Sequence, residues 1–362
     1  MNLLTLTISL ADQRFDQTKS LGIFNFSIGL SRALARNPNL ERLTVLTNSS
    51  LPPVGETDSG RAALTECAAG NTGKLWRLWW DQFGAYQAAR RAANEWLFLP
   101  KGYASCLRGS PVKLVTYIHD AMQEYYKRQY PRGLPRFENF YFRAGFRAAI
   151  AQSQVILTNT RFTAGEIQSA ADRYGLTMPR IEVVGMGFER PHIAASARSR
   201  ILVLASRWPH KRTALAVKYL SRWQEERKFP GPVDWIGQLP AKLVLPEAAN
   251  WQWHARVGQN DMNRFLGEAQ AVVYFSDYEG FGMPPVEAAI AGACPVYSDI
   301  SATREVMQGR GCCFPNEDYG AFAAALDEGL RIPQLQVNKW ADQLLIQHNW
   351  QDVAERIVSI LR

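Results

Sequence analysis

Short runs of β-forming residues alternate with longer amphipathic stretches along the whole of this 362-residue chain. Such alternation is typical of βα units, which build open parallel sheets covered by helices. The expected strands of the first half are Leu3–Leu10, Leu43–Thr47, Lys113–Ile118, Val155–Thr158 and Arg180–Val184. Those of the second half are Ile201–Ala205, Val233–Ile236, Ala271–Phe275 and Ala293–Tyr297. The sequence therefore predicts two successive α/β domains, each with its own parallel sheet.

The boundary between these domains is expected between residues 187 and 200, where periodicity lapses and Pro, Ala, Ser and Arg accumulate. We expect a first domain over residues 1–190 and a second over residues 198–347. Ligands of open α/β sheets bind beyond the carboxyl ends of the strands. If the two sheets face each other, residues that follow strands in both halves would line one cleft.

The formal net charge of +8 is confined to the first half, since residues 1–190 hold 23 Lys and Arg against 15 Asp and Glu, and the rest hold 18 of each. This asymmetry favours one half facing an anionic substrate, a membrane or nucleic acid. Basic and aromatic residues interleave over Glu124–Arg147, and Lys74–Phe83 has similar character. Such segments suit a membrane interface. They also bind single-stranded nucleic acid, but no RNA-binding motif accompanies them, so we expect no nucleic acid partner.

The five cysteines are odd in number, form no C-x-x-C pair and include the vicinal Cys312 and Cys313, which favours a reducing compartment. The first residues lack the basic start and small-residue cleavage site of a signal peptide. No run approaches the ~18 apolar residues that span a bilayer. We expect a cytoplasmic protein, with contact at the cytoplasmic face of the inner membrane as one option.

The strongest chemical motif is SDYEGFGMPPVE at Ser276–Glu287, between an apolar strand and an Ala-rich helix. Gly280 and Gly282 allow a tight turn that exposes backbone amides, and Pro284 and Pro285 fit a helix start. Amides at a helix start suit an anion such as a diphosphate.

Two glutamates, Glu279 and Glu287, flank this glycine loop with seven residues between them. A carboxylate there can accept two hydrogen bonds from the vicinal hydroxyls of a ribose or a sugar ring. Taken alone, the pattern also fits a strand–turn–helix joint with two solvated glutamates.

A basic cluster follows the first strand of the second half, at Arg207, His210, Lys211 and Arg212. Such a cluster can neutralise a nucleoside diphosphate and stabilise it as a leaving group. Its alternative is an exposed basic turn before an amphipathic helix.

Two weaker signals lie in the first half. His119 ends the strand VTYI, where a polar side chain would enter the cleft, although a lone histidine is more often structural. Gly22 lies in KSLGIFNFSIGLSRAL, at a turn between a strand and a helix, where glycine is common for conformational reasons alone.

The segment EGFGMPPVEAAIAGACPVYSDISATREV closely resembles the donor-site segment of retaining GT-B glycosyltransferases of the family 4 type. The resemblance implies that Glu279 lies by the donor sugar and that Glu287 binds the nucleotide ribose. The donor-binding loop that it implies consists of Gly280, Phe281, Gly282, Met283 and Pro284.

Other blocks resemble the same family. Lys211 is similar to the lysine of the family's basic pair, and Ser206 then stands at the arginine of that pair, with Arg207 one place late. Arg207 either replaces that arginine or points to solvent. His119 resembles a histidine beside the donor sugar and the acceptor hydroxyl, which implies a positioning and hydrogen-bonding role, with general base catalysis as an alternative. Gly22 resembles a glycine of the N-terminal loop near the donor phosphate.

The fold implied by the resemblance is GT-B: two Rossmann-like α/β domains face each other across a cleft, and a C-terminal helix over residues 348–362 crosses back to the first domain. Segments Leu157–Ile167, Val183–Phe188 and His348–Leu361 also match the family in order. The first domain would bind the acceptor and the second the nucleotide sugar.

No metal-ligand constellation and no D-x-D motif after a strand appears in the sequence, so we expect a metal-independent enzyme without a cofactor. The charge of the leaving group would be met by Lys211, Arg207 and the loop amides. The resemblance implies front-face attack, in which the departing phosphate oxygen takes the proton of the acceptor. Alternatively, Glu279 stabilises oxocarbenium character, as carboxylates of glycosidases do.

The prediction is a retaining transferase that moves a hexose, with mannose or rhamnose favoured, from a nucleoside diphosphate sugar to a growing cell-surface glycan such as lipopolysaccharide, capsule or exopolysaccharide. Two alternatives stay open: a nucleotide-sugar epimerase or hydrolase on the same fold, and a noncatalytic basic-aromatic protein that binds lipid or RNA.

Overall fold

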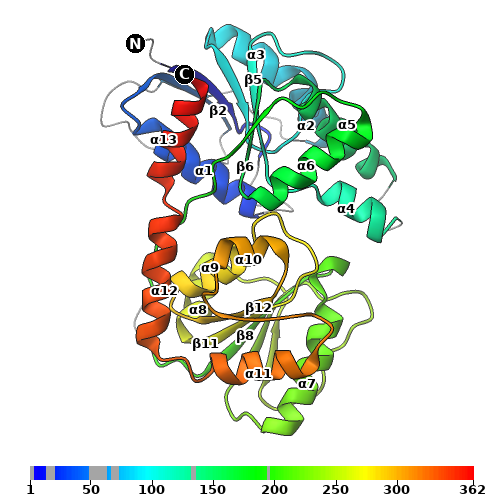
Figure 1. Cartoon of the computed structure of the whole chain (residues 1–362), viewed down its shortest axis with the longest axis vertical. Helices are drawn as coiled ribbons and strands as arrows, with labels where there is room; N and C mark the ends of the chain where they lie inside the picture. The colour runs from blue at the N-terminus through cyan, green and yellow to red at the C-terminus, as the bar shows by residue number, and fades with distance from the viewer. Residues whose placement is uncertain (1–3, 14–20, 49–62, 67–72, 132–135, 194–195) are drawn as a thin grey trace. The chain divides into compact units, whose positions relative to one another are not determined.

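A computed structural model describes residues 4–13, 21–48, 63–66, 73–131, 136–193 and 196–362 of the chain. It divides into two compact units (Figure 1), of which one comprises Met1–Phe188 with His348–Arg362 and the other Glu189–Gln347. The sequence placed the corresponding boundaries at residues 190, 198 and 348. The first two residues of KSLGIFNFSIGLSRAL and residues 132–135 of the basic-aromatic segment Glu124–Arg147 lie outside the described residues.

The first unit is built on a parallel sheet of order β3-β2-β1-β4-β5-β6-β7. Its strands are β1 (Leu4–Ser9), β2 (Leu40–Thr47), β3 (Ala63–Glu66), β4 (Trp96–Leu99), β5 (Lys113–Ile118), β6 (Val155–Thr158) and β7 (Arg180–Val183). Runs such as Leu114–Ile118 are buried throughout, because helices cover both faces of a parallel sheet.

The helices of the first unit come from both ends of the chain. They are α1 (Leu21–Ala35), α2 (Lys74–Trp79), the π-helical turn η1 (Trp80–Gly84), α3 (Ala85–Ala92), α4 (Met122–Gln129), α5 (Arg136–Gln152), α6 (Arg161–Tyr174) and α13 (Trp350–Leu361). The last helix, α13, lies beside α1 (Figure 1). Trp350 sits directly on Gly29 and Gly187, where a Cβ would come within 2.5 and 2.2 Å of the indole.

The second unit is built on a parallel sheet of order β10-β9-β8-β11-β12-β13. Its strands are β8 (Arg200–Ala205), β9 (Val233–Gly237), β10 (Trp251–His254), β11 (Ala269–Tyr274), β12 (Cys294–Ser298) and β13 (Cys312–Phe314). Its helices are the 3₁₀ turn η2 (Pro209–Lys211), α7 (Thr213–Arg227), α8 (Gln259–Glu268), α9 (Met283–Ile290), α10 (Ser301–Met307), α11 (Tyr319–Gly329) and α12 (Gln334–Gln347). Its aromatic core includes Trp223, Trp235, Phe275 and Phe322.

The two predicted parallel α/β domains are confirmed, and all nine expected strands are present with ends shifted by a few residues. The four strands β3, β4, β10 and β13 were not predicted. One local expectation was wrong: Gly22 lies within the first turn of α1 rather than in a turn before it, because the helix already begins at Leu21.

Each sheet has a place where the strand order reverses. In the first unit the chain leaves β3 and returns on the other side of β1 as β4, and in the second it leaves β10 and returns beside β8 as β11. Doubly wound sheets bind ligands outside the carboxyl ends of the strands at such a reversal. The fold therefore marks the ends of β1 and β4, and of β8 and β11, as candidate ligand sites.

Candidate active site

The reversal in the second unit brings two predicted motifs together. Ser206 and the turn η2 follow β8, and the segment Ser276–Glu287 follows β11. The backbone N–H of Asp277 donates to the carbonyl of His210 at 2.7 Å, which ties the two loops to each other. Motifs about seventy residues apart in the sequence thus share one edge of the sheet.

Lys211 and Glu279 form the centre of this site. The Lys211 ammonium lies 2.5 Å from Oε1 of Glu279 and also donates to the hydroxyl of Tyr274. The Tyr274 and Ser276 hydroxyls donate to the same Oε1 at 2.5 and 2.6 Å. Among the described residues, Oε2 of Glu279 and one of the three Lys211 N–H groups have no protein partner, so both can bind a ligand.

The charges of this centre are set by burial and by each other. Burial alone would raise the pKa of Glu279, but Lys211, His210 and the hydroxyl of Ser276 lower it below its ordinary value. Burial, with the neighbouring ammonium, lowers the pKa of His210 to about 4. At neutral pH the Glu279 carboxylate is therefore ionised and the His210 imidazole neutral.

The glycine loop ends in a conformation that needs glycine. Gly282 has φ of +85°, and a Cβ there would lie 2.7 Å from Cγ2 of Thr303. Helix α9 begins at the next residue, with Pro284 and Pro285 in its first turn, where a missing N–H has no intrahelical acceptor to lose. The loop thus presents the amino end of α9 at the carboxyl edge of the sheet, as predicted.

Glu287 is half-buried on α9, and desolvation raises its pKa from 4.5 to about 7. A carboxylate held this way in the absence of ligand is costly, and hydrogen bonds from two hydroxyls would compensate it. The contact between Glu287 and a ribose itself stays a prediction.

Three residues that the sequence analysis did not single out complete the site. Tyr274 and Ser276 share Glu279 with Lys211, and Asn316 donates to the Ser276 carbonyl at 3.0 Å and to Oδ1 of Asp277 at 2.8 Å. The available signal for the first two was their position at the end of an apolar strand. Nothing near Asn316 in the sequence pointed to the site.

Arg207 and Ser206 stand next to and at the position of the arginine in the family's basic pair, and the structure places them in different surroundings. The exposed Arg207 has its guanidinium 5.1 Å from the ring centroid of Trp208 and forms no ion pair with the described residues. The backbone of Ser206 is bonded to Thr213: its N–H donates to the Thr213 hydroxyl at 2.9 Å, and its carbonyl accepts from the same hydroxyl at 2.7 Å. Instead Arg212, with φ of +48°, reaches the motif and pairs with Asp277 at 3.2 Å.

A half-exposed indole lies beside the same edge. Trp253 is 51% exposed and its Nε1 donates to the carbonyl of Gly237 at 2.8 Å. Gly237 has φ of +121°, and a Cβ there would lie 2.0 Å from the carbonyl oxygen of Ala205. The close approach of two strand ends thus leaves an aromatic face available for a flat ring such as a nucleobase.

In the first unit His119 directly follows β5 and is half-buried beside Phe26 and Tyr117, at ring-centroid distances of 4.8 and 4.6 Å. Its Nε2 lies 2.8 Å from the carbonyl of Pro100. A carbonyl only accepts, so Nε2 carries the proton and Nδ1 of the neutral ring is an acceptor. Burial lowers the pKa of His119 to about 4, which keeps the ring neutral at pH 7.

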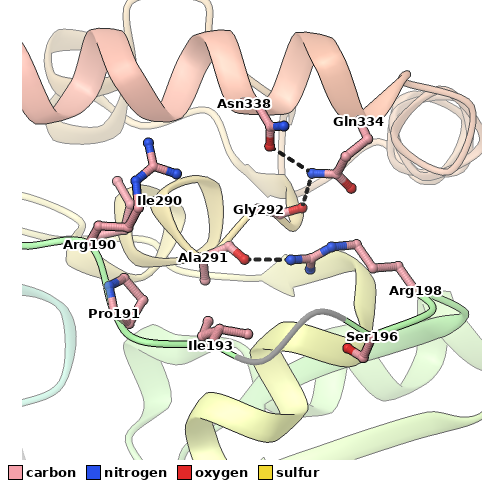
Figure 2. A pocket seen from close by; sticks show the side chains of 10 residues that line it. All are labelled: Arg190, Pro191, Ile193, Ser196, Arg198, Ile290, Ala291, Gly292, Gln334 and Asn338. Carbon is pink, nitrogen blue, oxygen red and sulfur yellow. Dashed lines mark hydrogen bonds between the residues drawn. The ribbon is translucent and has the colours of Figure 1, made fainter.

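A pocket of about 450 Å³ lies at the other end of α9 from the glycine loop (Figure 2). Arg198 donates to the carbonyl of Ala291 at 2.6 Å there, and Gln334 donates to that of Gly292 at 2.9 Å. These bonds satisfy carbonyls at the carboxyl end of a helix. The pocket therefore belongs to the packing around α9 rather than to the predicted donor site.

No group of three or more His, Cys, Asp and Glu in the described part of the chain could hold a metal ion. Metal independence itself stays a prediction. Among the described helices, none is long and apolar enough to cross a membrane.

Comparisons with known proteins show what the chain is similar to. Residues 198–331 match the family model described as Glycosyl transferases group 1. The O-antigen chain mannosyltransferase RfbU of Salmonella typhimurium is 24% identical over 209 residues, which are 56% of this chain and 56% of that protein. The match thus spans little more than half the length of this curated relative.

Solved structures share the fold over nearly the whole chain. A sucrose-phosphate synthase from Thermosynechococcus elongatus has a TM-score of 0.67 at 12% identity, covering 99% of this chain and 98% of the other. A structure described as trehalose-6-phosphate from E. coli bound with UDP-2-fluoro glucose has a TM-score of 0.65 at 9% identity, covering 99% and 98%. The chain thus has two Rossmann-like parallel-sheet α/β domains, an architecture that it shares with these solved structures.

Proposed function

We propose that the chain is a retaining, metal-independent glycosyltransferase of the family 4 type that moves a hexose, with mannose or rhamnose favoured, from a nucleoside diphosphate sugar to a cell-surface glycan. The observation that carries the proposal is the Lys211–Glu279 centre at the amino end of α9, within the residues that match the glycosyl transferases group 1 model. The O-antigen mannosyltransferase relative supports the choice of sugar and glycan.

The chemistry follows from the contacts around Lys211. When a diphosphate enters, the ammonium has one N–H for a phosphate oxygen and can exchange its bond to Glu279 for another. The amino end of α9 adds the favourable end of a helix dipole. Both stabilise the negative charge that develops on the leaving group.

Glu279 in the second unit and His119 in the first each present a hydrogen-bond acceptor. Oε2 of Glu279 can accept a hydrogen bond from a sugar hydroxyl, and the neutral His119 presents Nδ1 as an acceptor rather than as an acid. With a pKa of about 4, His119 is also a weak base, which favours its positioning role over general base catalysis.

The test is a thermal-shift panel of UDP, GDP, dTDP and their common sugar conjugates. Wild type should respond to one nucleotide, by about 2.7 kcal/mol at a free concentration 100 times the Kd. Lys211→Ala should lose this response, whereas Lys218→Ala, on the exposed face of α7, should keep it. A folded wild type that responds to no nucleotide would contradict the proposal and favour a noncatalytic binding protein.

Product analysis tests the stereochemistry. With the responding donor and a glycan acceptor, NMR of the product should show the anomeric configuration of the donor. An inverted product would reject the retaining mechanism while leaving the transferase in place. Release of free sugar without any acceptor dependence would favour the hydrolase alternative.

We also propose peripheral contact with the cytoplasmic face of the inner membrane. Four large apolar side chains on α2 and α5 are exposed: Leu75 (83%), Trp79 (46%), Phe137 (67%) and Phe140 (72%). Exposed aromatic and aliphatic residues beside basic ones suit a lipid interface. These four residues lie within the two basic-aromatic segments of the sequence, and we propose that they form the membrane-contact surface on α2 and α5.

Cosedimentation with phosphatidylglycerol and phosphatidylcholine vesicles tests this contact. Trp79→Ser combined with Phe140→Ser should abolish binding, whereas Leu335→Ser, at an exposed position of α12, should leave it unchanged. Equal binding of all three proteins would contradict the proposed surface.

A further inference from the structure

Charged residues gather at the strand reversal of the first unit, where neither the donor site nor His119 uses them. Asp12 follows β1 and Lys101 follows β4, two strands that pair directly. Asp81, from η1, lies against both through Lys101. The place is the one at which a doubly wound sheet binds a ligand.

Lys101 is shared between the two carboxylates. Its ammonium donates to Oδ2 of Asp12 and, at 3.0 Å, to Oδ1 of Asp81. The hydroxyl of Tyr141 donates to Oδ2 of Asp81 at 2.7 Å. The side chains of Lys101 and Asp81 are 23% and 27% exposed, so a molecule from solution can reach them.

One oxygen of this cluster has no hydrogen-bond partner among the residues that the structure describes. Asp12 is only 2% exposed, and its Oδ1 is buried without a hydrogen bond. An unsatisfied carboxylate oxygen is costly in the interior, and native proteins rarely keep one without a reason. Lys101 likewise has a third N–H without an acceptor among the described residues.

The π-helical turn η1, which carries Asp81, is held in place by a hydrogen bond from Trp80 and by close packing at Gly84. The Nε1 of Trp80 donates to the hydroxyl of Ser9, at the end of β1, at 3.0 Å. A Cβ at Gly84 would lie 2.5 Å from the Trp80 ring, so the packing of η1 needs glycine there. Single π-helical turns are rare and are frequently found at functional sites.

The charges of the residues in this cluster favour an uncharged ligand. Burial raises the pKa of Asp81 and lowers that of Lys101, while Arg77 acts on Asp81 in the opposite direction. With Arg77 the set is neutral, and its central ammonium is already held by two carboxylates. A diphosphate would have to displace a carboxylate, whereas a hydroxyl can donate to the accessible Asp81 and a ring oxygen can accept from Lys101.

We propose that Asp12, Asp81 and Lys101 bind the hydroxyls of an uncharged saccharide, the terminal residue of the acceptor. The inference rests on the proposed function and names the acceptor class: a neutral glycan end rather than a lipid diphosphate. The peptide carbonyl of Pro100, next to Lys101, is the group that fixes His119. The acceptor cluster is therefore continuous with the histidine expected beside the reacting hydroxyl.

Saturation-transfer NMR on the full chain tests the site with methyl glycosides of glucose, galactose, mannose, rhamnose and N-acetylglucosamine. At least one should bind, and Asp12→Asn or Asp81→Asn should weaken it about tenfold, which corresponds to loss of one hydrogen bond to a charged group. The matched control is Glu95→Gln, since Glu95 pairs with Lys113 at the opposite, amino edge of the same strands at 2.5 Å. Lys211→Ala should also keep glycoside binding.

Three outcomes would overturn the inference. The first is that no glycoside binds. The second is that both Asn variants, with native near-UV circular dichroism, bind the glycoside as wild type does. The third is that inorganic pyrophosphate binds Lys211→Ala but no longer binds the double variant Lys211→Ala with Lys101→Ala. A nucleotide response lost in Lys211→Ala together with no glycoside binding would reject only the acceptor site. Glycoside binding without any nucleotide response would reject the proposed function instead.

Discussion

The half-buried Glu287 gives the sharpest quantitative expectation. Its folded pKa of about 7, against an ordinary 4.5, means that the folded state binds an extra proton between these values. The free energy of unfolding therefore falls as pH rises through this window. The full penalty on the ionised form is roughly 3 kcal/mol at pH 8, and it is under about 1 kcal/mol at pH 5.

Glu287→Gln keeps the shape of the protonated acid, so the ligand-free variant should be more stable than wild type, and more so at high pH. For a unit of this size, 1 kcal/mol shifts Tm by about 2–4 °C, which gives about 6–12 °C at pH 8 and less than about 4 °C at pH 5. Differential scanning calorimetry measures both. Glu225→Gln, an exposed position on α7, should change Tm little at either pH. Equal shifts at the two pH values, or a destabilised variant at pH 8, would refute the reasoning.

Three further changes test single contacts. Tyr274→Phe removes a hydroxyl that donates to Glu279 at 2.5 Å, and should cost about 1.5–3 kcal/mol by urea unfolding; no loss would show that the bond is not formed in solution. Gly237→Ala would bring a Cβ to 2.0 Å from the carbonyl of Ala205 and should cost about 3 kcal/mol or more or prevent folding; a stable variant would contradict the strand geometry. Trp350→Ala should destabilise the first unit by about 3–5 kcal/mol, seen as an earlier calorimetric transition, while the transition of the second unit stays in place.

The alternation of strands and helices was enough to predict two parallel sheets, because strands buried on both faces read as continuous apolar runs. Three of the four strands that escaped prediction lack that signal, whereas β4 (Trp96–Leu99) is a run of four buried apolar residues. β13 has three residues and β3 four, and β10 is half-buried at its two ends and exposed at its two central residues instead of forming a buried apolar run. Their pairing depends on neighbouring strands that no local pattern reveals.

The candidate site was predictable where residues follow strands, as Lys211, Glu279 and Glu287 do. Arg207 shows the limit of that reasoning. Spacing placed it one residue from the arginine of the family, but the short turn η2 after it decides which side chains face the loop, and Arg212 reaches Asp277 instead. The cluster around Asp81 was hidden for a different reason, since its members come from three segments with no shared motif.

The helix α13 makes the first unit discontinuous, because its last piece is synthesised after the whole of the second unit. During translation, Glu189–Gln347 can collapse on its own strands as soon as it emerges. Gly29 and Gly187, in contrast, must wait for the indole of Trp350 that covers them. The domain that begins first is thus completed last, and until then its exposed glycine surface is a place where a nascent chain can mispair or recruit a chaperone.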